Sequence, residues 1–190
     1  MTGERKQEIL QTAIEIIADE GYSSLSMRSL ARASGMKLGA LQYHFRTWEE
    51  LLRCIMGYID KHIREAFEAQ DLQLGSASVS EIVEFMLTDT TVTEDALFGD
   101  KLWPQLWAME QVEPLVSDLL EEVYADYLEI LEKAMAAAGS ESPRAEALCV
   151  MSLTEGESLF MGQGRRWEQD RSEVRKTMLK FIEIKYGENS

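Results

Sequence analysis

The segment ASGMKLGALQYHFRTW, residues 33–48, holds side chains whose types and spacing fit recognition chemistry. Lys37 can bind guanine or phosphate, and Gln42 can pair with adenine through two hydrogen bonds. Leu38 and Ala40 are apolar groups of the kind that contact thymine methyls. Side chains of these types along one short helix are typical of a surface that reads base edges in the major groove.

Charge is unevenly distributed along the chain, and this segment lies in a window without acid. The whole chain has a formal net charge of −15, from 34 acidic and 19 basic residues. Residues 1–60 hold seven basic and eight acidic side chains, whereas residues 61–190 hold twelve and twenty-six. Residues 21–48 hold no acid but contain Arg28, Arg32, Lys37, His44 and Arg46. The window predicts contact with a polyanion; the alternative is an ordinary helical hairpin with a solvated basic face.

Two short predicted helices position these side chains. Ser26 is a good N-cap for the first helix, and Gly35 supplies a sharp turn that a residue with a Cβ would resist. The second helix covers residues 37–44. Leu41 and Phe45, four residues apart, are the predicted apolar anchors that hold it on its neighbours. Two short helices joined in this way, the second led by a basic residue, have the layout of a helix-turn-helix.

Helical periodicity continues through the rest of the chain, and strand-like alternation is almost absent. With 190 residues, 45% of them apolar and 28% charged, the composition is that of a folded protein. We expect an all-α fold of about nine helices. The expected helices cover residues 4–20, 26–34, 37–44, 47–70, 79–88, 96–111, 114–139, 143–162 and 170–186.

Several classes of protein are disfavoured by what the sequence lacks. The first ten residues have no apolar core of a secretion signal, and no run of about eighteen apolar residues occurs. We therefore expect a cytoplasmic protein without membrane association. Cys54 and Cys149 lie far apart and lack metal-ligand spacing. With two histidines, no GxSxG motif and no phosphate-cradling glycine loop, we expect no catalytic residues, no metal and no cofactor.

A longer pattern surrounds the predicted helix-turn-helix. A helix ending in EGY at residues 20–22 precedes SMRSLA at 26–31 and ASGM at 33–36. GAL, HF and EELL then follow at 39–41, 44–45 and 49–52. Over residues 5–55 this pattern resembles the TetR family of bacterial transcriptional regulators. Beyond residue 55 the resemblance rests on helix count and a loosely similar layout, which includes LWPQLWAMEQVEPL.

The resemblance implies an all-α homodimer that binds a palindromic operator in double-stranded DNA. It implies a three-helix DNA-binding domain, residues 1–48, and a larger ligand-binding and dimerisation domain, residues 49–190. Lys37 stands where the family usually has a small N-cap, Gln42 where a tyrosine usually contacts phosphate, and Trp48 where a lysine commonly does. The expected DNA-binding residues are Arg28, Lys37, Leu38, Gly39, Ala40, Gln42, Tyr43, His44 and Trp48.

The larger domain offers candidates for a ligand pocket. Aromatic and methionine side chains can line an apolar pocket, although at helical spacing they are usually core. Glu155 and Glu157 lie in an otherwise apolar helix, and an acid beside aromatic faces would suit a cationic ligand. The alternative is that these glutamates are solvated or lie at a dimer rim. The expected ligand-binding residues are Phe85, Met86, Trp103, Trp107, Met109, Glu155 and Phe160.

The last two predicted helices are the expected dimer interface, both by resemblance and by composition. One carries a stripe of mainly small side chains, which permits close packing, and the other carries an apolar face: Ala145, Cys149, Ser152, Gly156 and Phe160, then Val174, Met178, Phe181 and Ile182. Two such helices from each subunit would form a four-helix bundle. The alternative is that both helices complete the core of a monomer.

The leading functional prediction is a ligand-responsive transcriptional regulator, most simply a repressor, released from its operator by a small apolar or cationic molecule. The helix predicted over residues 47–70 would link the DNA-binding and ligand-binding parts. The alternative is a DNA-bound interaction protein that recruits a protein partner and binds no small ligand. The third reading, an enzyme, is disfavoured by the missing motifs described above.

Overall fold

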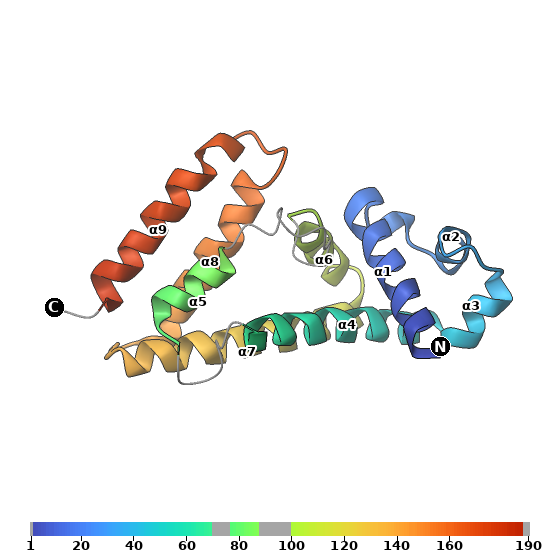
Figure 1. The fold of residues 1–190 in the computed structure, drawn as a ribbon, viewed down its shortest axis with the longest axis horizontal. Helices are drawn as coiled ribbons and strands as arrows, with labels where there is room; N and C mark the ends of the chain where they lie inside the picture. Colours follow the sequence, from blue (N-terminus) through green and yellow to red (C-terminus); the bar gives the residue numbers. More distant parts are fainter. Residues whose placement is uncertain (1, 70–76, 88–99, 188–190) are drawn as a thin grey trace. The chain divides into compact units, whose positions relative to one another are not determined.

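The protein is all-helical over the residues that the computed structural model describes, which are 2–69, 77–87 and 100–187 (Figure 1). Within these ranges there are nine α-helices and no strand, which confirms the predicted fold class. The predicted end of the fourth helix at residue 70, the predicted end of the fifth at residue 88 and the start of the sixth at residues 96–99 lie outside the described residues. None of the described helices is long and apolar enough to cross a membrane.

The chain packs as two compact units. The first, here called the head unit, comprises the described residues within 1–63 and 90–122. The second, here called the C-terminal unit, comprises those within 64–89 and 123–190. The head unit thus combines the N-terminal helices with a segment from the middle of the chain. The domain boundary predicted at residue 48 divides the chain by function, into DNA-binding and ligand-binding parts, and not by compactness; it stays a prediction.

The head unit begins with the helices that form the predicted helix-turn-helix. Ser26 accepts a hydrogen bond from the backbone N–H of Ser29 and forms a capping box with it, so the predicted N-cap is confirmed. Gly35 has a φ of 66°, the left-handed conformation that its position in the turn requires. The elements are α1 (Thr2–Glu20), the 3-10 helix η1 (Tyr22–Ser24), α2 (Met27–Ala33), α3 (Leu38–His44) and α4 (Trp48–Ala69).

The middle segment of the chain completes the head unit with α6 (Leu102–Glu110), which packs against α1. Pro104 lies in the first turn of α6, where a missing backbone N–H costs no helical hydrogen bond. The next helix, α7 (Pro114–Ala137), begins at Pro114 as predicted. Its first turns belong to the head unit and the remainder to the C-terminal unit.

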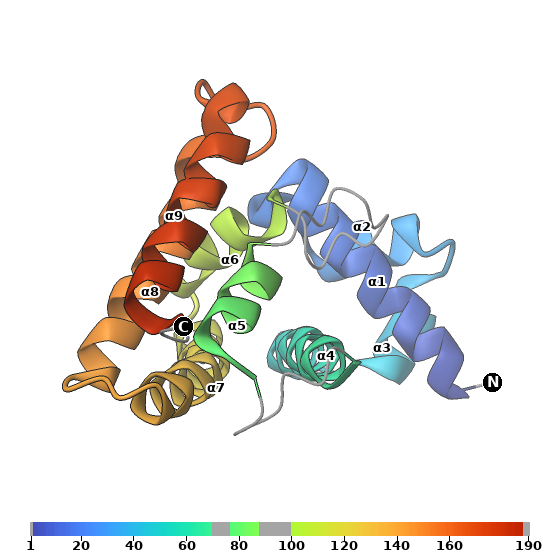
Figure 2. The same ribbon diagram turned by 60° about the vertical axis from the view of Figure 1, so that its left-hand side comes forward.

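The C-terminal unit contains three helices that contact one another, α5, α8 and α9 (Figure 2). They are α5 (Val79–Met86), α8 (Pro143–Met161) and α9 (Arg171–Tyr186), the last preceded by the 3-10 helix η4 (Glu168–Asp170). Ser78 and Glu81 form a capping box at the start of α5. Ser142 stands at the N-cap of α8, but its side chain makes no capping hydrogen bond.

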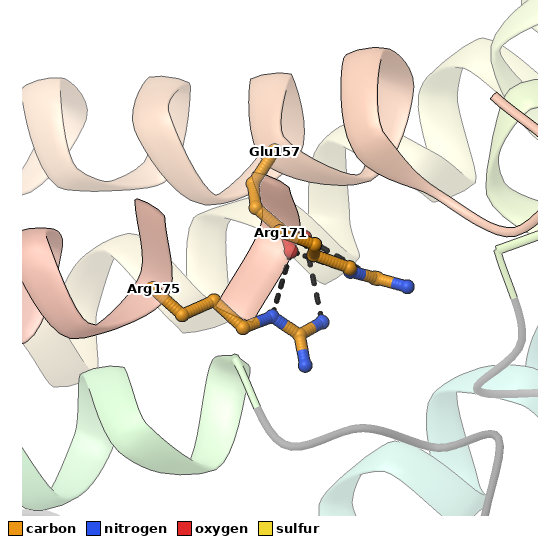
Figure 3. Close-up of polar contacts among 3 residues, drawn as sticks. All are labelled: Glu157, Arg171 and Arg175. Atoms are coloured by element: carbon orange, nitrogen blue, oxygen red, sulfur yellow. Dashed lines mark hydrogen bonds and ion pairs between the residues drawn. The ribbon is translucent and has the colours of Figure 1, made fainter. Parts of the chain in front are cut away.

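A carboxylate at each end of α8 ties that helix to α9. Glu157 is 3% exposed and accepts hydrogen bonds from Nε of Arg171 at 2.5 Å and Nε of Arg175 at 2.6 Å (Figure 3). At the other end, Glu146 pairs with Lys185 at 2.7 Å and accepts a hydrogen bond from Tyr186. These contacts, with the Lys185 contact the largest, lower the pKa of Glu146 to about 2. The two helices are therefore fixed against each other at two separated points.

Candidate nucleic-acid interface and ligand site

The outward surface of α3 is formed by the residues predicted to contact DNA. Tyr43 is 81% exposed, and Lys37, Gly39, Ala40 and Gln42 are also exposed. On α2, Arg28 is exposed as well, whereas Leu38 and His44 are half-buried. The structure therefore brings eight of the nine predicted residues to the exposed or partly exposed surface of the helix-turn-helix.

The opposite side of α3 is anchored in the core of the head unit. Leu41 and Phe45 are fully buried, as the sequence predicts, and α3 packs against α2. Burying side chains of this size stabilises a fold by about 1.5–3 kcal/mol each. The exposed residues of α3 therefore stand on a helix held in a fixed position.

Two basic residues of α1 reinforce that anchoring. The guanidinium of Arg5 donates a hydrogen bond of 2.7 Å to the backbone carbonyl of Ser34, in the turn between α2 and α3. The ammonium of Lys6 lies 5.1 Å from the centre of the Phe45 ring, within the range of a cation–π contact. Both contacts connect α1 directly to the helix-turn-helix.

Lys37 is the N-cap of α3, and it has extended backbone angles but no capping hydrogen bond from its side chain. A serine at this position would accept a hydrogen bond from the first turn of the helix. Lysine has no acceptor and instead places an exposed positive charge at the start of α3. At this position the chain exchanges helix capping for charge.

Trp48, the ninth predicted DNA contact, makes its polar contact inside the head unit. Its indole N–H donates a hydrogen bond of 3.3 Å to Glu113, and the same carboxylate oxygen accepts one from the Tyr22 hydroxyl. The rings of Tyr22 and Trp48 lie 6.4 Å apart. Burial first, and then the Glu113 carboxylate, raise the pKa of Tyr22 well above its ordinary value. Since indole has a single donor, Glu113 takes the hydrogen bond that a DNA phosphate would need.

Two further contacts between distant parts of the sequence stabilise the region around Tyr22 and Trp48. Gln105 accepts a hydrogen bond of 3.2 Å from the backbone N–H of Tyr22. Lys101 pairs with Asp19 at 2.8 Å. Together with the Glu113 hydrogen bonds, these pairs connect the end of α1 and the start of α4 to α6 and to the residue that precedes α7. Nothing in the local sequence pattern indicated these pairs.

The predicted ligand-binding residues are divided between the two units. Trp103, Trp107 and Met109 lie on α6 in the head unit, where Met109 is fully buried and the tryptophans are half-buried. Phe85, Met86, Glu155 and Phe160 lie in the C-terminal unit. Within that unit Phe160 is 56% exposed and contacts Trp167, whereas Phe85 belongs to a separate ring cluster.

That cluster includes aromatic residues that the sequence interpretation missed. Phe67, at the end of α4, lies with its ring centre 4.6 Å from Phe85 and 5.3 Å from Tyr127. Tyr124 lies 6.3 Å from Tyr127 and donates a hydrogen bond to Glu155. The spacing of Tyr124 and Tyr127, three residues apart on α7, is a signal that sequence reasoning could have used.

Large apolar side chains remain exposed on α8 and α9. Met178 and Ile182, predicted to form part of an interface, are instead buried within the unit, each 8% exposed. Phe181, from the same predicted face, is 63% exposed. The exposed apolar residues of the two helices are Leu148, Leu153, Leu159, Phe160, Phe181 and Ile184, and this set is called the apolar α8–α9 surface below.

An anchored α3 with exposed basic and polar side chains, preceded by a capped α2 and a glycine turn, defines the head unit as a helix-turn-helix of the DNA-binding class. Residues 9–55 match the family model described as bacterial regulatory proteins, tetR family. This match covers about a quarter of the chain, and it shows that the N-terminal part is similar to the TetR family, the resemblance that the sequence pattern indicates.

Individual proteins are also similar to this chain in sequence or in fold. The chain is 27% identical over 119 residues to the HTH-type transcriptional regulator BetI of Cronobacter sakazakii, a match that covers 60% of this chain and 57% of that relative. The fold is similar to that of a transcriptional regulator from Saccharomonospora viridis solved in complex with choline, with a TM-score of 0.72 and 21% identity. That similarity covers 95% of this chain and 96% of the other. AibR, solved in complex with isovaleryl coenzyme A and operator DNA, has a TM-score of 0.72, 20% identity and coverages of 96% and 98%.

Proposed function

We propose that this protein is a ligand-responsive transcriptional repressor that binds a palindromic operator as a homodimer. The observation that carries the proposal is the α3 surface, where Gln42 and Tyr43 are exposed while Leu41 and Phe45 are fully buried. A surface of this kind combines a fixed orientation with side chains that can bind bases and phosphates. It lies within the acid-free window of an otherwise strongly acidic chain.

In the proposed complex α3 lies in the major groove and reads base edges through Gln42, Leu38 and Ala40. Lys37, Tyr43 and Arg28 bind phosphates and fix the register of the protein on DNA. Gly39 permits a close approach of the backbone, and His44 lies at the half-buried end of the helix. We leave Trp48 out of this interface, because Glu113 accepts its hydrogen bond.

We propose that the apolar α8–α9 surface binds a second copy of this chain. Monomeric proteins rarely expose large contiguous apolar patches. Four of the six residues of this surface are more than half exposed: Phe181 at 63%, Ile184 at 74%, Phe160 at 56% and Leu153 at 55%. A dimer has a functional reason, since paired recognition helices bind half-sites one DNA turn apart. This surface therefore takes Phe160 away from the ligand-binding set.

The effector in this proposal is a small apolar or cationic molecule bound by the C-terminal part of the chain. Proteins of similar fold have been solved with bound organic molecules, the Saccharomonospora viridis regulator with choline and AibR with isovaleryl coenzyme A and operator DNA. The helix α4 contains both Trp48, bonded to Glu113, and Phe67, in the ring cluster. Effector binding would shift the equilibrium of this helix and change the spacing of the two α3 helices.

The proposed function is tested first by selecting binding sites from a random DNA library at moderate salt. We expect a palindromic consensus with two half-sites about one helical turn apart. In binding measurements Gln42→Ala should relax discrimination at one base pair per half-site by about 1–3 kcal/mol. Tyr43→Ala should weaken binding to all sequences alike. Gln7→Ala, an exposed glutamine on α1, is the matched control and should change neither quantity.

A wild-type protein without sequence preference would refute the regulator proposal. Release by effectors is tested separately, with a small-molecule screen on the selected operator. If the operator is bound specifically and no small molecule releases it, the DNA-bound interaction protein becomes the better description. The dimer is tested by analytical ultracentrifugation of Phe181→Glu, with the exposed neighbour Lys180→Glu as the matched control.

A further inference from the structure

Four aromatic rings and one carboxylate form a continuous set of contacts within the C-terminal unit. The ring centres of Phe67 and Phe85 lie 4.6 Å apart, those of Phe67 and Tyr127 5.3 Å, and those of Tyr127 and Tyr124 6.3 Å. The hydroxyl of Tyr124 donates a hydrogen bond to the carboxylate of Glu155. Residues of α4, α5, α7 and α8 thus meet in one cluster, called the Glu155 cluster below.

The orientation of these rings suits a positively charged guest. The planes of Phe67 and Phe85 are inclined at 61°, and those of Tyr124 and Tyr127 at 72°. Rings at such steep angles present their faces in different directions, and each face carries the negative part of the ring quadrupole. Phe85, Tyr124 and Tyr127 are only half-buried, so part of each ring remains accessible.

The carboxylate at the end of the cluster has no cationic partner among the residues that the structure describes. Glu155 is half-buried, and no ion pair of the described residues includes it. Burial raises its pKa to about 7, and the hydrogen bond from Tyr124 opposes part of that rise. Glu157, two residues along the same helix, is by contrast bound by both Arg171 and Arg175 (Figure 3). A bound cation would give Glu155 the counter-charge that Glu157 has from the protein.

We propose that Glu155 and the ring faces of Tyr124 and Tyr127 bind the charged group of a small organic cation, of the ammonium class. The inference rests on the proposed function, since it assigns a chemical class and a set of residues to the effector of that repressor. Recognition would come from charge attraction to Glu155 and from cation–π attraction to the rings. Phe67 brings α4 into the same cluster, which gives the bound cation a direct effect on that helix.

The test compares two molecules of the same shape that differ in charge. Isothermal titration calorimetry of the full chain measures binding of choline and of its uncharged analogue, in which a carbon atom replaces the nitrogen. We expect choline to bind and the analogue to bind at least about tenfold more weakly, because the analogue keeps the apolar contact area and loses both electrostatic attractions.

Three variants assign the effect to residues. Glu155→Gln keeps a hydrogen-bond acceptor for Tyr124 and removes the charge, so choline affinity should fall at least about tenfold while the affinity for the analogue stays constant. Tyr127→Leu removes a ring face and should weaken choline binding more than analogue binding. Glu121→Gln, an exposed carboxylate on α7, is the matched control and should bind both molecules as the wild type does.

The outcomes separate this inference from the proposed function. Equal affinity for choline and the analogue, no binding of choline at millimolar concentration, or unchanged choline affinity of Glu155→Gln would each overturn the cation site. Operator binding is measured on the same preparations. Specific operator binding by Glu155→Gln shows that the variant is folded and that the DNA-binding function stands, whichever way the cation result falls.

Discussion

Replacing Glu157 by glutamine should destabilise the C-terminal unit strongly, because it removes the carboxylate that binds two largely buried guanidinium groups. The Glu157 side chain is 3% exposed, and those of Arg171 and Arg175 are 12% and 15% exposed. In Glu157→Gln two guanidinium groups would stay at that depth without the carboxylate. Breaking a buried ion pair from one side costs about 3–5 kcal/mol, and we expect a loss of unfolding free energy in this range.

The assay is urea unfolding followed by circular dichroism at one fixed protein concentration, since dimerisation makes stability depend on concentration. Glu173→Gln is the matched control on α9, where the carboxylate is 82% exposed and 4.0 Å from Lys176. That change should stay within about 0.5 kcal/mol. The salt dependence of the unfolding free energy is a second measurement, because added salt screens an exposed ion pair far more than a buried one.

Replacing one arginine should cost less than replacing the glutamate. Arg171→Met leaves Glu157 bound to Arg175, whereas Glu157→Gln takes the carboxylate away from both guanidinium groups. The reasoning is refuted if Glu157→Gln costs less than about 1 kcal/mol, or if it costs no more than the exposed control. Either result would mean that water solvates the two guanidinium groups despite their burial.

Three further predictions concern single side chains. Glu113→Gln should destabilise the head unit by about 1–3 kcal/mol, measured by chemical unfolding, since the acceptor of Tyr22 and Trp48 loses its charge; unchanged stability would contradict that role. Glu155 holds its proton up to a pH of about 7 in the folded state and loses it at lower pH when unfolded, so its contribution to stability is complete in acid and falls as pH rises through 7. Glu155→Gln should therefore gain stability over the wild type between about pH 5 and pH 8, by at most about 3 kcal/mol before solvent screening, and a pH-independent difference would refute the shift. Lys37→Ser should stabilise α3 by about 1 kcal/mol through capping, yet lower the salt dependence of operator binding by about one unit of slope; an unchanged slope would exclude a phosphate contact.

The features that were predicted well from the sequence depend on interactions between residues close together in the chain. Ser26 and Gly35 mark a helix start and a turn through local backbone chemistry, and Leu41 and Phe45 are anchors because their spacing puts both on one side of a helix. Ser142 stands at the N-cap of α8 but makes no capping hydrogen bond, because a suitable residue at an N-cap position need not form one.

The contacts that the sequence did not reveal join residues far apart in the chain. Glu113 accepts from Trp48 across 65 positions, and no periodicity marks either residue as a partner of the other. The ring of Phe67 meets Tyr127 in the same way, through packing of α4 on α7. Phe181 and Ile182 are adjacent in sequence, and packing rather than hydropathy makes one exposed and the other buried. Such choices depend on the whole fold.

The composition of the head unit limits how this protein can be recombined with others. A gene fusion that transplants residues 1–48 into another regulator would leave Tyr22 and Trp48 without Glu113, and Asp19 without Lys101. The exchangeable module is discontinuous in the gene, because it needs the segment 100–122 together with the N-terminal helices. A chimera that carries both segments would keep these contacts. One that carries only residues 1–48 would need equivalent contacts from the recipient protein.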